Sequence, residues 1–410
     1  MFPVLVLTLV FMGCTRDLNR MAPPQQVPQA EAAVPQAEPV QEDTVYREQA
    51  ARLAASMDDA RLAAQVLMSG IDGKPPALSD AMKTLLRNSP PGGIMLFKYN
   101  LDAEKERIRA FLDACSAYIA AATAEQDELL RIPPFIAVDH EGGAVHRFGP
   151  EVSRLPEPAW FWETAQKYGR DYALTELESA ALRSGEEIKA LGITMNLAPV
   201  AEVLDEENRL FLEGRSYGPD PAFTEAAVQA FIRGMEAAGI ACVVKHFPGN
   251  TGTDPHKGRA ILARDAQALN RMVQPFAGVI RDKEPAAIMV SHIVVPAWDG
   301  ERNASLSSRV IRERLRGTLG FTGIVIGDDF SMGAVADAGL SLEAAVVEAL
   351  NAGLDMVMTW PRNLRGVHDA ILKAVQEGRL PRARLQEAVE QILFEKLRYG
   401  LIQEKNRDEI

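Results

Sequence analysis

Short apolar runs recur through residues 51–410, and stretches with a helical spacing of apolar positions separate them. The runs are continuous rather than alternating, which is typical of parallel strands that are buried on both faces. Amphipathic patterns lie between the runs, for example at 171–191, 222–238 and 341–352, and a glycine follows each of these three. We expect eight strands, at 65–70, 93–97, 134–139, 194–200, 241–247, 286–292, 324–329 and 355–359.

Eight strands that are each followed by a helix predict an α/β fold, a single (β/α)8 barrel, for residues 51–410. A doubly wound open sheet is the alternative, but no GxGxxG motif follows the first strand. Because length alone suggests two or three domains, the regular series of strands is what favours one large barrel.

Polar side chains gather where the apolar runs stop. They are Asp139, Glu141, Asn196, Lys245, His246, His292, Asp328 and Asp329. An aspartate after one strand is often only a helix N-cap. Five strands that end in polar residues favour a functional site, because the carboxyl ends of barrel strands converge on the face that carries the active site.

The first residues of the chain resemble an export signal. Residues 2–13 are apolar and too short to cross a bilayer, and they have the length of the hydrophobic region of a signal peptide. The run ends in Gly13-Cys14, as in a bacterial lipoprotein signal, so we expect a signal at 1–14, a lipid on Cys14 and an exported, membrane-anchored protein in the periplasm or at the cell surface. No Lys or Arg precedes the run, and an uncleaved, cytoplasmic N-terminus is the alternative.

Residues 15–50 are rich in Pro, Ala, Gln and Glu, with VPQAE at 27–31 and again at 34–38. Such a composition buries too little apolar surface to offset the entropy of ordering the chain. We therefore expect a disordered tether at 15–50 and a catalytic domain at 51–410.

The composition excludes several classes of protein. With 47% hydrophobic and 24% charged residues, the chain is an ordinary globular one. Its net charge is −12; the tether holds three basic and six acidic residues, so −9 remains on residues 51–410, and nucleic acid is not an expected partner. Three cysteines make no disulfide framework, and His246 and His256 have no further ligand at zinc-like spacing, so we expect no metal and no organic cofactor.

The most informative segment is KHFPG at 245–249, followed by TDPH at 253–256 and, downstream, by GDDFSM at 327–332. Together these motifs resemble the glycoside hydrolase family 3 β-N-acetylhexosaminidases, typified by the peptidoglycan-recycling β-N-acetylglucosaminidase. The resemblance runs from about residue 60 to 360. It also includes DHEGGAVHR at 139–147, NLAPV at 196–200, GRSYG at 214–218 and NASLS at 303–307.

A retaining glycosidase needs a carboxylate nucleophile and a separate proton donor for the leaving oxygen. Asp328 matches the family's nucleophile, and by the resemblance the proton donor is His256, oriented by Asp254. Alternate residues of an extended chain share a side, so Asp254 is able to hold the imidazole of His256. Asp329 is adjacent to Asp328 and would point to the opposite side, as a helix cap or a supporting group.

The resemblance implies sugar-binding roles for Asp139, Arg147, Arg215, Lys245 and His246. The chain also departs from the family. Asn250-Thr251 replaces His-Gly after KHFPG, the following loop is about two residues shorter, and Pro255 separates Asp254 from His256. His140 and Gly327 stand where the family commonly has glutamine and serine, and we expect both changes to alter the sugar subsite.

These inferences predict a retaining exo-β-N-acetylglucosaminidase that acts, as a monomer, on terminal β-linked N-acetylglucosamine of peptidoglycan fragments or related oligosaccharides. The family's β-glucosidases and β-xylosidases draw their acid from a second domain, and none is expected after this barrel. Two alternatives stay open. One is a family 3 β-glycosidase or phosphorylase with another sugar specificity, and the other is a catalytically impaired, surface-tethered carbohydrate-binding lipoprotein.

Overall fold

The computed structural model of the chain describes residues 39–75, 77–124, 130–150, 152–253, 258–282, 285–336 and 339–402. From Val40 onward the chain forms one compact unit. Three residues with predicted roles, Cys14, Asp254 and His256, lie outside the described residues.

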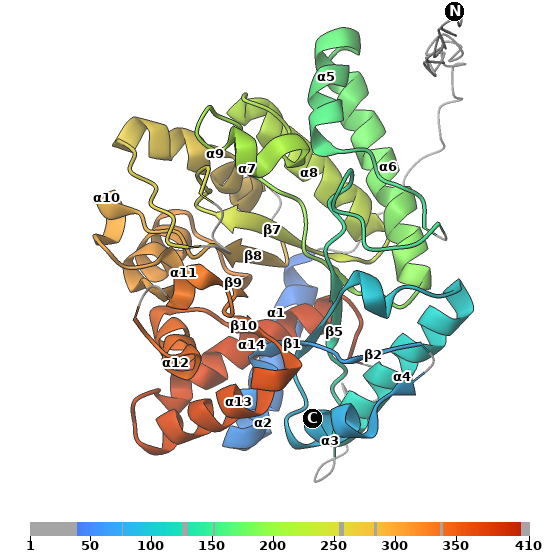
Figure 1. The fold of residues 1–410 in the computed structure, drawn as a ribbon. Helices are drawn as coiled ribbons and strands as arrows, with labels where there is room; N and C mark the ends of the chain where they lie inside the picture. Colours follow the sequence, from blue (N-terminus) through green and yellow to red (C-terminus); the bar gives the residue numbers. More distant parts are fainter. Residues whose placement is uncertain are drawn as a thin grey trace, which may run out of the picture. The chain divides into compact units, whose positions relative to one another are not determined.

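Eight parallel strands close into a barrel in the order β1-β10-β9-β8-β7-β6-β5-β4 (Figure 1). The strands are β1 (Leu67–Gly70), β4 (Gly93–Leu96), β5 (Phe135–Val138), β6 (Met195–Asn196), β7 (Ala241–Phe247), β8 (Ala287–Val290), β9 (Ile324–Asp329) and β10 (Met356–Thr359). Each overlaps one of the predicted strands, so the (β/α)8 barrel is confirmed. A separate antiparallel pair, β2 (Gly73–Lys74) and β3 (Ala77–Leu78), follows β1.

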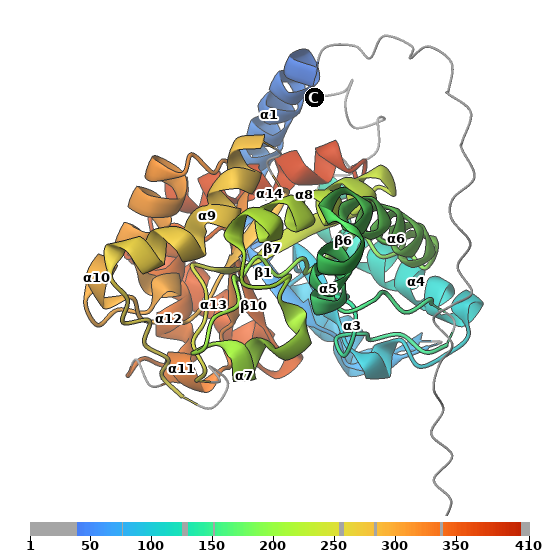
Figure 2. The same ribbon diagram turned by 90° about the horizontal axis from the view of Figure 1, so that it is seen from above.

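Helices surround the barrel, as the view from above in Figure 2 shows. The α-helices are α1 (Pro39–Ser56), α2 (Asp59–Gln65), α3 (Asp80–Asn88), α4 (Lys105–Thr123), α5 (Pro158–Tyr168), α6 (Arg170–Ala190), α7 (Arg209–Leu212), α8 (Pro221–Ala237), α9 (Ala266–Asp282), α10 (Pro296–Asp299), α11 (Gly333–Ala336), α12 (Leu342–Ala352), α13 (Pro361–Gln376) and α14 (Arg382–Arg398). Short 3-10 turns are η1 (Lys98–Asn100), η3 (Glu213–Arg215) and η4 (Ala304–Leu306), and η5 (Arg309–Thr318) is a π-type helix.

Local signals in the sequence explain where several helices begin. Asp58, Ser79, Asp220 and Ser341 each precede a helix, and each side chain accepts a backbone N–H of its first turn. These bonds satisfy N–H groups that have no partner within the helix. None of the described helices is both long and apolar enough to cross a membrane.

The strands of the barrel are buried from end to end, with one exception. Every residue of the other seven strands is buried, whereas β9 becomes partly exposed at Asp328 and Asp329. Burial on both faces is why the strands read as continuous apolar runs. The opening at the end of β9 lies at the carboxyl face of the barrel, where the predicted site residues meet.

Helix α1 corrects the predicted extent of the tether. The prediction of a disordered segment at 15–50 is wrong for residues 39–50, which are helical. Tyr46, Ala50 and Leu53 recur at helical spacing and are all buried. The many Gln, Glu and Asp residues around them hid this apolar stripe in the composition of the segment.

Candidate active site

A cavity of about 340 Å³ lies at the carboxyl ends of the barrel strands. It is lined by Met95, Phe97, Asp139, Glu141, Val145, Arg147, Leu197, Phe211, Arg215, Lys245, His246, Asn250, Met289, Asp328, Asp329, Met358 and Trp360. Larger hollows over α10 and α12 are lined by charged side chains that pair with one another, such as Arg302 with Glu348. The cavity in the barrel mouth instead combines a charged wall with an apolar one, as small-molecule sites commonly do.

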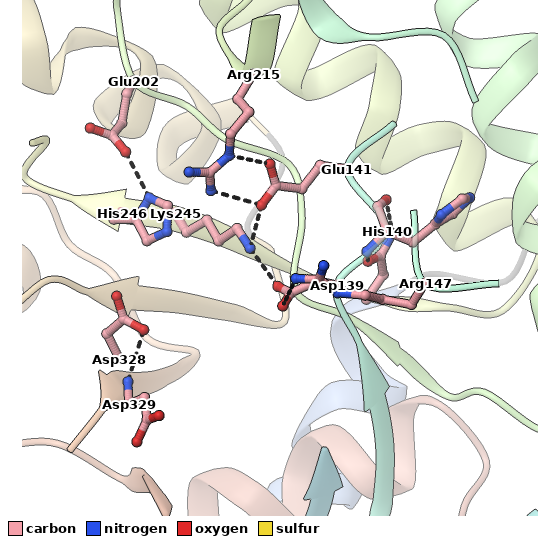
Figure 3. A network of polar contacts seen from close by, with 11 residues as sticks. Asp139, His140, Glu141, Arg147, Glu202, Arg215, Lys245, His246, Asp328 and Asp329 are labelled. Carbon is pink, nitrogen blue, oxygen red and sulfur yellow. Dashed lines mark hydrogen bonds and ion pairs between the residues drawn. The ribbon is translucent and has the colours of Figure 1, made fainter. Parts of the chain in front are cut away.

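Lys245, at the end of β7, is the centre of the charged wall (Figure 3). Its Nζ lies 2.7 Å from Oδ1 of Asp139, which follows β5, and 2.7 Å from Oε1 of Glu141. Arg147 Nη2 lies 3.2 Å from the other oxygen of Asp139. Burial opposes the ammonium charge of Lys245, but the two carboxylates outweigh it and raise the pKa of this lysine. Lys245 therefore stays charged and is held rigidly in the cavity wall.

Glu141 ties Lys245 to Arg215. The guanidinium of Arg215 donates from Nε and Nη2 to the two oxygens of Glu141, at 2.7 and 2.9 Å. This is the bidentate geometry that makes an arginine–carboxylate pair both strong and directional. Burial alone would raise the pKa of Glu141, but Lys245 and Arg215 hold it well below its usual range.

His246 is oriented by a buried acid. Its Nδ1 lies 2.6 Å from Oε1 of Glu202, which also accepts the side-chain amide of Asn250 at 3.0 Å, while Oε2 accepts the backbone N–H of Asn250 at 2.5 Å. An ionised carboxylate only accepts hydrogen bonds, so Nδ1 of His246 carries the proton. The other ring nitrogen is then left for the cavity that His246 lines.

Asp328 and Asp329 end β9 with different environments. The backbone N–H of Asp329 donates to Oδ1 of Asp328 at 2.8 Å. Burial by itself raises the pKa of Asp328, but the imidazoles of His246 and His292, the backbone N–H of Asp329 and the ammonium of Lys245 outweigh burial and lower it. Asp329 instead accepts both the N–H and the hydroxyl of Ser331, and the indole N–H of Trp360 at 2.7 Å. Asp328 is thus an ionised carboxylate that no side chain of the described residues hydrogen-bonds, and Asp329 supports the structure around it.

His292 holds the end of β9 through the backbone carbonyl of Asp329. It is fully buried; Nε2 lies 3.1 Å from the carbonyl oxygen of Asp329, and Nδ1 lies 2.7 Å from Oγ of Ser305. Because a carbonyl only accepts, Nε2 donates and Nδ1 accepts the serine hydroxyl. Burial lowers the pKa of His292, so the ring is neutral and serves to hold the backbone next to Asp328.

The two single-residue departures from the family pattern lie outside the cavity. His140 is buried, with Nε2 2.8 Å from Oγ of Ser184, and burial together with His146 lowers its pKa to about 3. At Gly327 a Cβ atom would lie 2.5 Å from the ring of Phe330, so a serine would not fit there. Neither residue lines the cavity, so an effect of these two changes on the sugar subsite would be indirect.

No three side chains of the His, Cys, Asp and Glu types come together as a metal site within the described ranges. The positive charges of the cavity come from Lys245, Arg147 and Arg215. Such a wall binds the hydroxyl or carbonyl oxygens of a polar ligand through charge-assisted hydrogen bonds.

Comparison with known proteins gives the family. The family model described as "Glycosyl hydrolase family 3 N terminal domain" matches residues 61–394. The chain belongs to glycosyl hydrolase family 3. The predicted class of enzyme, a glycoside hydrolase, is confirmed by this match and by the curated relatives.

Three relatives illustrate how far the family 3 similarity extends. The chain is 31% identical over 299 residues to the β-hexosaminidase A of Pseudoalteromonas piscicida, covering 69% of this chain and 47% of that protein. It is 34% identical over 327 residues to a β-hexosaminidase of Stenotrophomonas maltophilia (strain R551-3), covering 78% and 90%. A structure of a glycoside hydrolase family 3 β-N-acetylglucosaminidase from Paenibacillus sp. str. FPU-7 has a TM-score of 0.77 and 29% identity, covering 84% and 63%. The chain thus spans less than two thirds of the Pseudoalteromonas and Paenibacillus proteins.

The barrel brings most of the predicted site residues of this family 3 chain together. Six of them line the one cavity: Asp139, Arg147, Arg215, Lys245, His246 and Asp328. The predicted acid/base pair lies outside the described residues. Sequence reasoning missed Glu202 and Trp360. Glu202 lies two residues after the NLAPV motif, and nothing in the sequence indicates that it is buried.

Proposed function

We propose that the protein is a retaining exo-β-N-acetylglucosaminidase that removes terminal β-linked N-acetylglucosamine from peptidoglycan fragments or related oligosaccharides. The observation that carries the proposal is Asp328, an ionised carboxylate at the end of β9 in a cavity it shares with Lys245 and His246. The N-acetylhexosamine specificity is supported by the names of the relatives, which are β-hexosaminidases and a β-N-acetylglucosaminidase.

In the proposed reaction Asp328 attacks the anomeric carbon, the glycosidic C–O bond breaks, and a covalent glycosyl-aspartate forms. His256, oriented by Asp254, protonates the leaving oxygen and then takes a proton from the water that releases the sugar. The roles of His256 and Asp254 rest on the sequence pattern. The lowered pKa of Asp328 supports its role, because a nucleophilic carboxylate has to be ionised at neutral pH.

Recognition of the terminal sugar is assigned to the charged wall. Lys245, fixed between two carboxylates, and Arg147 offer donors, while Asp139 offers acceptors to sugar hydroxyl groups. His246 presents its second ring nitrogen, and Arg215 lines the cavity beside Glu141. Because these groups are bound to one another before any ligand arrives, little side-chain entropy is lost when the sugar binds.

The test is hydrolysis of an aryl β-N-acetylglucosaminide, measured beside the aryl β-glucoside and β-xyloside, each with and without phosphate. We expect turnover of the N-acetylated sugar only, with N-acetylglucosamine and no sugar phosphate as product. Asp328→Asn should lose at least about 10³-fold in kcat. Turnover of that variant close to wild type would remove the nucleophile assignment, and preference for glucoside or formation of a sugar-1-phosphate would reassign the activity.

The acid/base role of His256 has a separate signature. His256→Ala should slow hydrolysis of a substrate with a poor leaving group by about 10²–10⁴-fold, but slow glycosylation by an activated aryl glycoside much less. With the activated substrate, the variant should accumulate an adduct that adds the mass of one N-acetylhexosaminyl residue, visible by intact mass spectrometry. Equal losses on both substrates, with no adduct, would contradict the role.

We also propose that the protein is exported and held at a membrane by a lipid on Cys14, and that it acts as a monomer. The apolar run at 2–13 and the Gly13-Cys14 junction support the anchor. Cys14→Ser should move the protein from the membrane fraction to the soluble fraction of cells. An unchanged distribution, or a wild-type protein found in the cytoplasm, would overturn the anchor and favour the uncleaved N-terminus.

A further inference from the structure

Asn250 contacts both oxygens of the Glu202 carboxylate. Its backbone N–H donates to Oε2 at 2.5 Å, and its side-chain Nδ2 donates to Oε1 at 3.0 Å. Oε1 also lies 2.6 Å from Nδ1 of His246. In the part of the chain that the structure describes, His246 and Asn250 are the partners of this carboxylate. The acid that orients His246 is therefore itself held by one other residue.

The barrel brings these residues together. β6 and β7 are neighbouring strands, and the loop after β6 stays paired with the end of β7. Val200 forms a parallel bridge with Lys245, and the N–H of Ala201 donates to the carbonyl of Lys245 at 2.7 Å. Glu202 is the next residue of that loop, and its side chain is fully buried. Asn250 follows β7 by three residues and is 1% exposed, so the bonds between the two are shielded from water.

Gly249, the last residue of the KHFPG motif, lets the chain turn so that Asn250 reaches Glu202. Its φ is +132°, in the region that residues with a side chain rarely adopt. A Cβ atom at this position would lie 2.7 Å from Cε of Met272. The glycine thus allows the approach of the backbone N–H of Asn250, and this backbone bond does not depend on which side chain follows.

The side chain of Asn250 adds the bond at Oε1, the oxygen that also faces His246. The terminal torsion of a glutamate is broad, so hydrogen-bond partners set the direction of its oxygens. A carboxylate oxygen accepts along two lone-pair directions, and with Nδ2 of Asn250 on one of them the other is left for Nδ1 of His246. Oδ1 of Asn250 is buried and has no hydrogen-bond partner among the described residues. An unpaired buried carbonyl lowers stability, so the bond to Glu202 explains this amide better than its own stability does.

We infer that the side chain of Asn250 is a positioning residue, which holds Oε1 of Glu202 and through it keeps His246 in the orientation that binds the terminal sugar. This inference rests on the proposed function, in which His246 presents its second ring nitrogen to the sugar. Asn250 stands at a position where the chain departs from the family pattern, so this side-chain bond belongs to the chain's own sequence. Asn250 acts here through Glu202 and not by touching the reacting atoms.

A double-mutant cycle tests this role. We would measure kcat/KM for an aryl β-N-acetylglucosaminide in Asn250→Ala, alone and combined with Glu202→Gln. The single variant should lose about 3- to 10-fold, as expected for one hydrogen bond when the backbone bond remains. The same substitution should cost less than about twofold in the Glu202→Gln background, because the two residues act through one network. Equal losses in both backgrounds, or no loss in the single variant, would overturn the inference.

Two control variants separate positioning from packing. Asn250→Leu keeps nearly the shape of the side chain but has no donor, so it should lose about as much as Asn250→Ala. Activity of Asn250→Leu close to wild type would mean that the side chain only fills space. Asn208→Ala removes another fully buried asparagine, whose amide bonds to backbone groups of Val203 and Asp205. Its effect should be the same with and without Glu202→Gln, and a coupling as large as that of Asn250→Ala would contradict a specific role.

The proton on Nδ1 of His246 gives a readout that does not need hydrolysis. In proton NMR of the full chain it should appear as a downfield resonance that is absent from His246→Gln and exchanges slowly with water, because its bond to Glu202 is buried. In Asn250→Ala the exchange should be at least about threefold faster, since Oε1 of Glu202 has lost its second partner. If the wild type hydrolyses no aryl glycoside, the proposed function fails and this rate decides the positioning by itself. An unchanged exchange rate would overturn it.

Discussion

The buried acid Glu141 offers a direct measure of what holds the charged wall together. We consider Glu141→Gln, which keeps the size of the side chain and removes its charge. The Glu141 side chain is 2% exposed, its partner Lys245 is 4% exposed, and Arg215 is 24% exposed. The substitution therefore leaves two cations largely shielded from water and without the carboxylate that accepts from both.

The magnitude follows from this burial. Breaking a buried ion pair by removing one partner costs about 3–5 kcal/mol, because the remaining charge is uncompensated. Lys245 keeps its bond to Asp139, and Arg215 has partial access to water, so we expect the lower end of the range, about 3 kcal/mol of the free energy of unfolding. The measurement is urea unfolding of Glu141→Gln and wild type at pH 7.

Glu178→Gln is the matched control for this experiment. Glu178 pairs with Arg233 at a similar distance, 2.7 Å, but both side chains are almost half exposed. An exposed pair contributes about 0–1 kcal/mol, since water already solvates both charges. Equal, small losses in the two variants would refute the argument that burial makes the Glu141 pair important.

The difference in the free energy of unfolding between wild type and Glu141→Gln should depend on pH in a definite direction. The partners of Glu141 hold its folded pKa below the value of about 4.3 expected in the unfolded chain. Its contribution is therefore fully present above that unfolded pKa and is lost as the pH falls towards the folded pKa. The stability difference between wild type and Glu141→Gln should be largest near pH 7 and smaller at pH 3. A difference that grew on acidification would contradict the assignment.

Three further predictions concern single side chains. Glu202→Gln removes the carboxylate that accepts a hydrogen bond from His246, so kcat/KM for an aryl N-acetylglucosaminide should fall by about 10–100-fold. The variant should keep a native circular dichroism spectrum, and full activity would exclude this orienting role. Asp329→Asn keeps an acceptor for the indole N–H of Trp360 and should lower kcat by less than about tenfold. Asp328→Asn should lower kcat by at least about 10³-fold. The opposite order of the two losses would exchange the two roles. Burial lowers the pKa of Lys396 to about 7, so the unfolded chain binds one more proton between about pH 7 and 10. The free energy of unfolding of the wild type should rise over that range, and Lys396→Met should abolish this rise in urea titrations.

The strands were predictable because a strand that is buried on both faces is a continuous run of apolar residues in the sequence. At β7 the predicted and observed bounds coincide at 241–247. At β6 they do not: only Met195 and Asn196 form the strand, and the rest of the apolar run at 194–200 continues as a loop. An apolar run indicates burial, and the buried segment at 197–200, which lies beside β7, produces such a run as well as a strand does.

Part of the site was predictable for a similar reason. Polar residues directly after apolar strands have few structural explanations, and the barrel topology brings their ends together. Asp139, Lys245 and Asp328 were found in this way. Glu202 was missed because it lies in a loop, where an acidic residue is ordinary, and nothing local indicates that its carboxylate is buried against His246 and Asn250.

The N-terminal boundary shows the limit of composition as evidence. Residues 39–50 have the polar content of a tether, yet they begin a helix whose apolar side chains Tyr46, Ala50 and Leu53 belong to the hydrophobic core. A short apolar stripe is stabilising only when a surface exists to receive it, and helices of this kind owe their stability to tertiary packing more than to propensity.

The amino-acid sequence by itself determined the class of fold, the strands and the residue types of the charged wall, because strand burial and strand-end position leave local patterns. Only the tertiary structure decided which charges pair, that Glu202 orients His246, and that Phe97 stacks on both Trp360 and Tyr99. These three rings come from two loops that are far apart in the chain. Their alignment depends on the closure of the barrel, which places β10 and β4 on either side of β1.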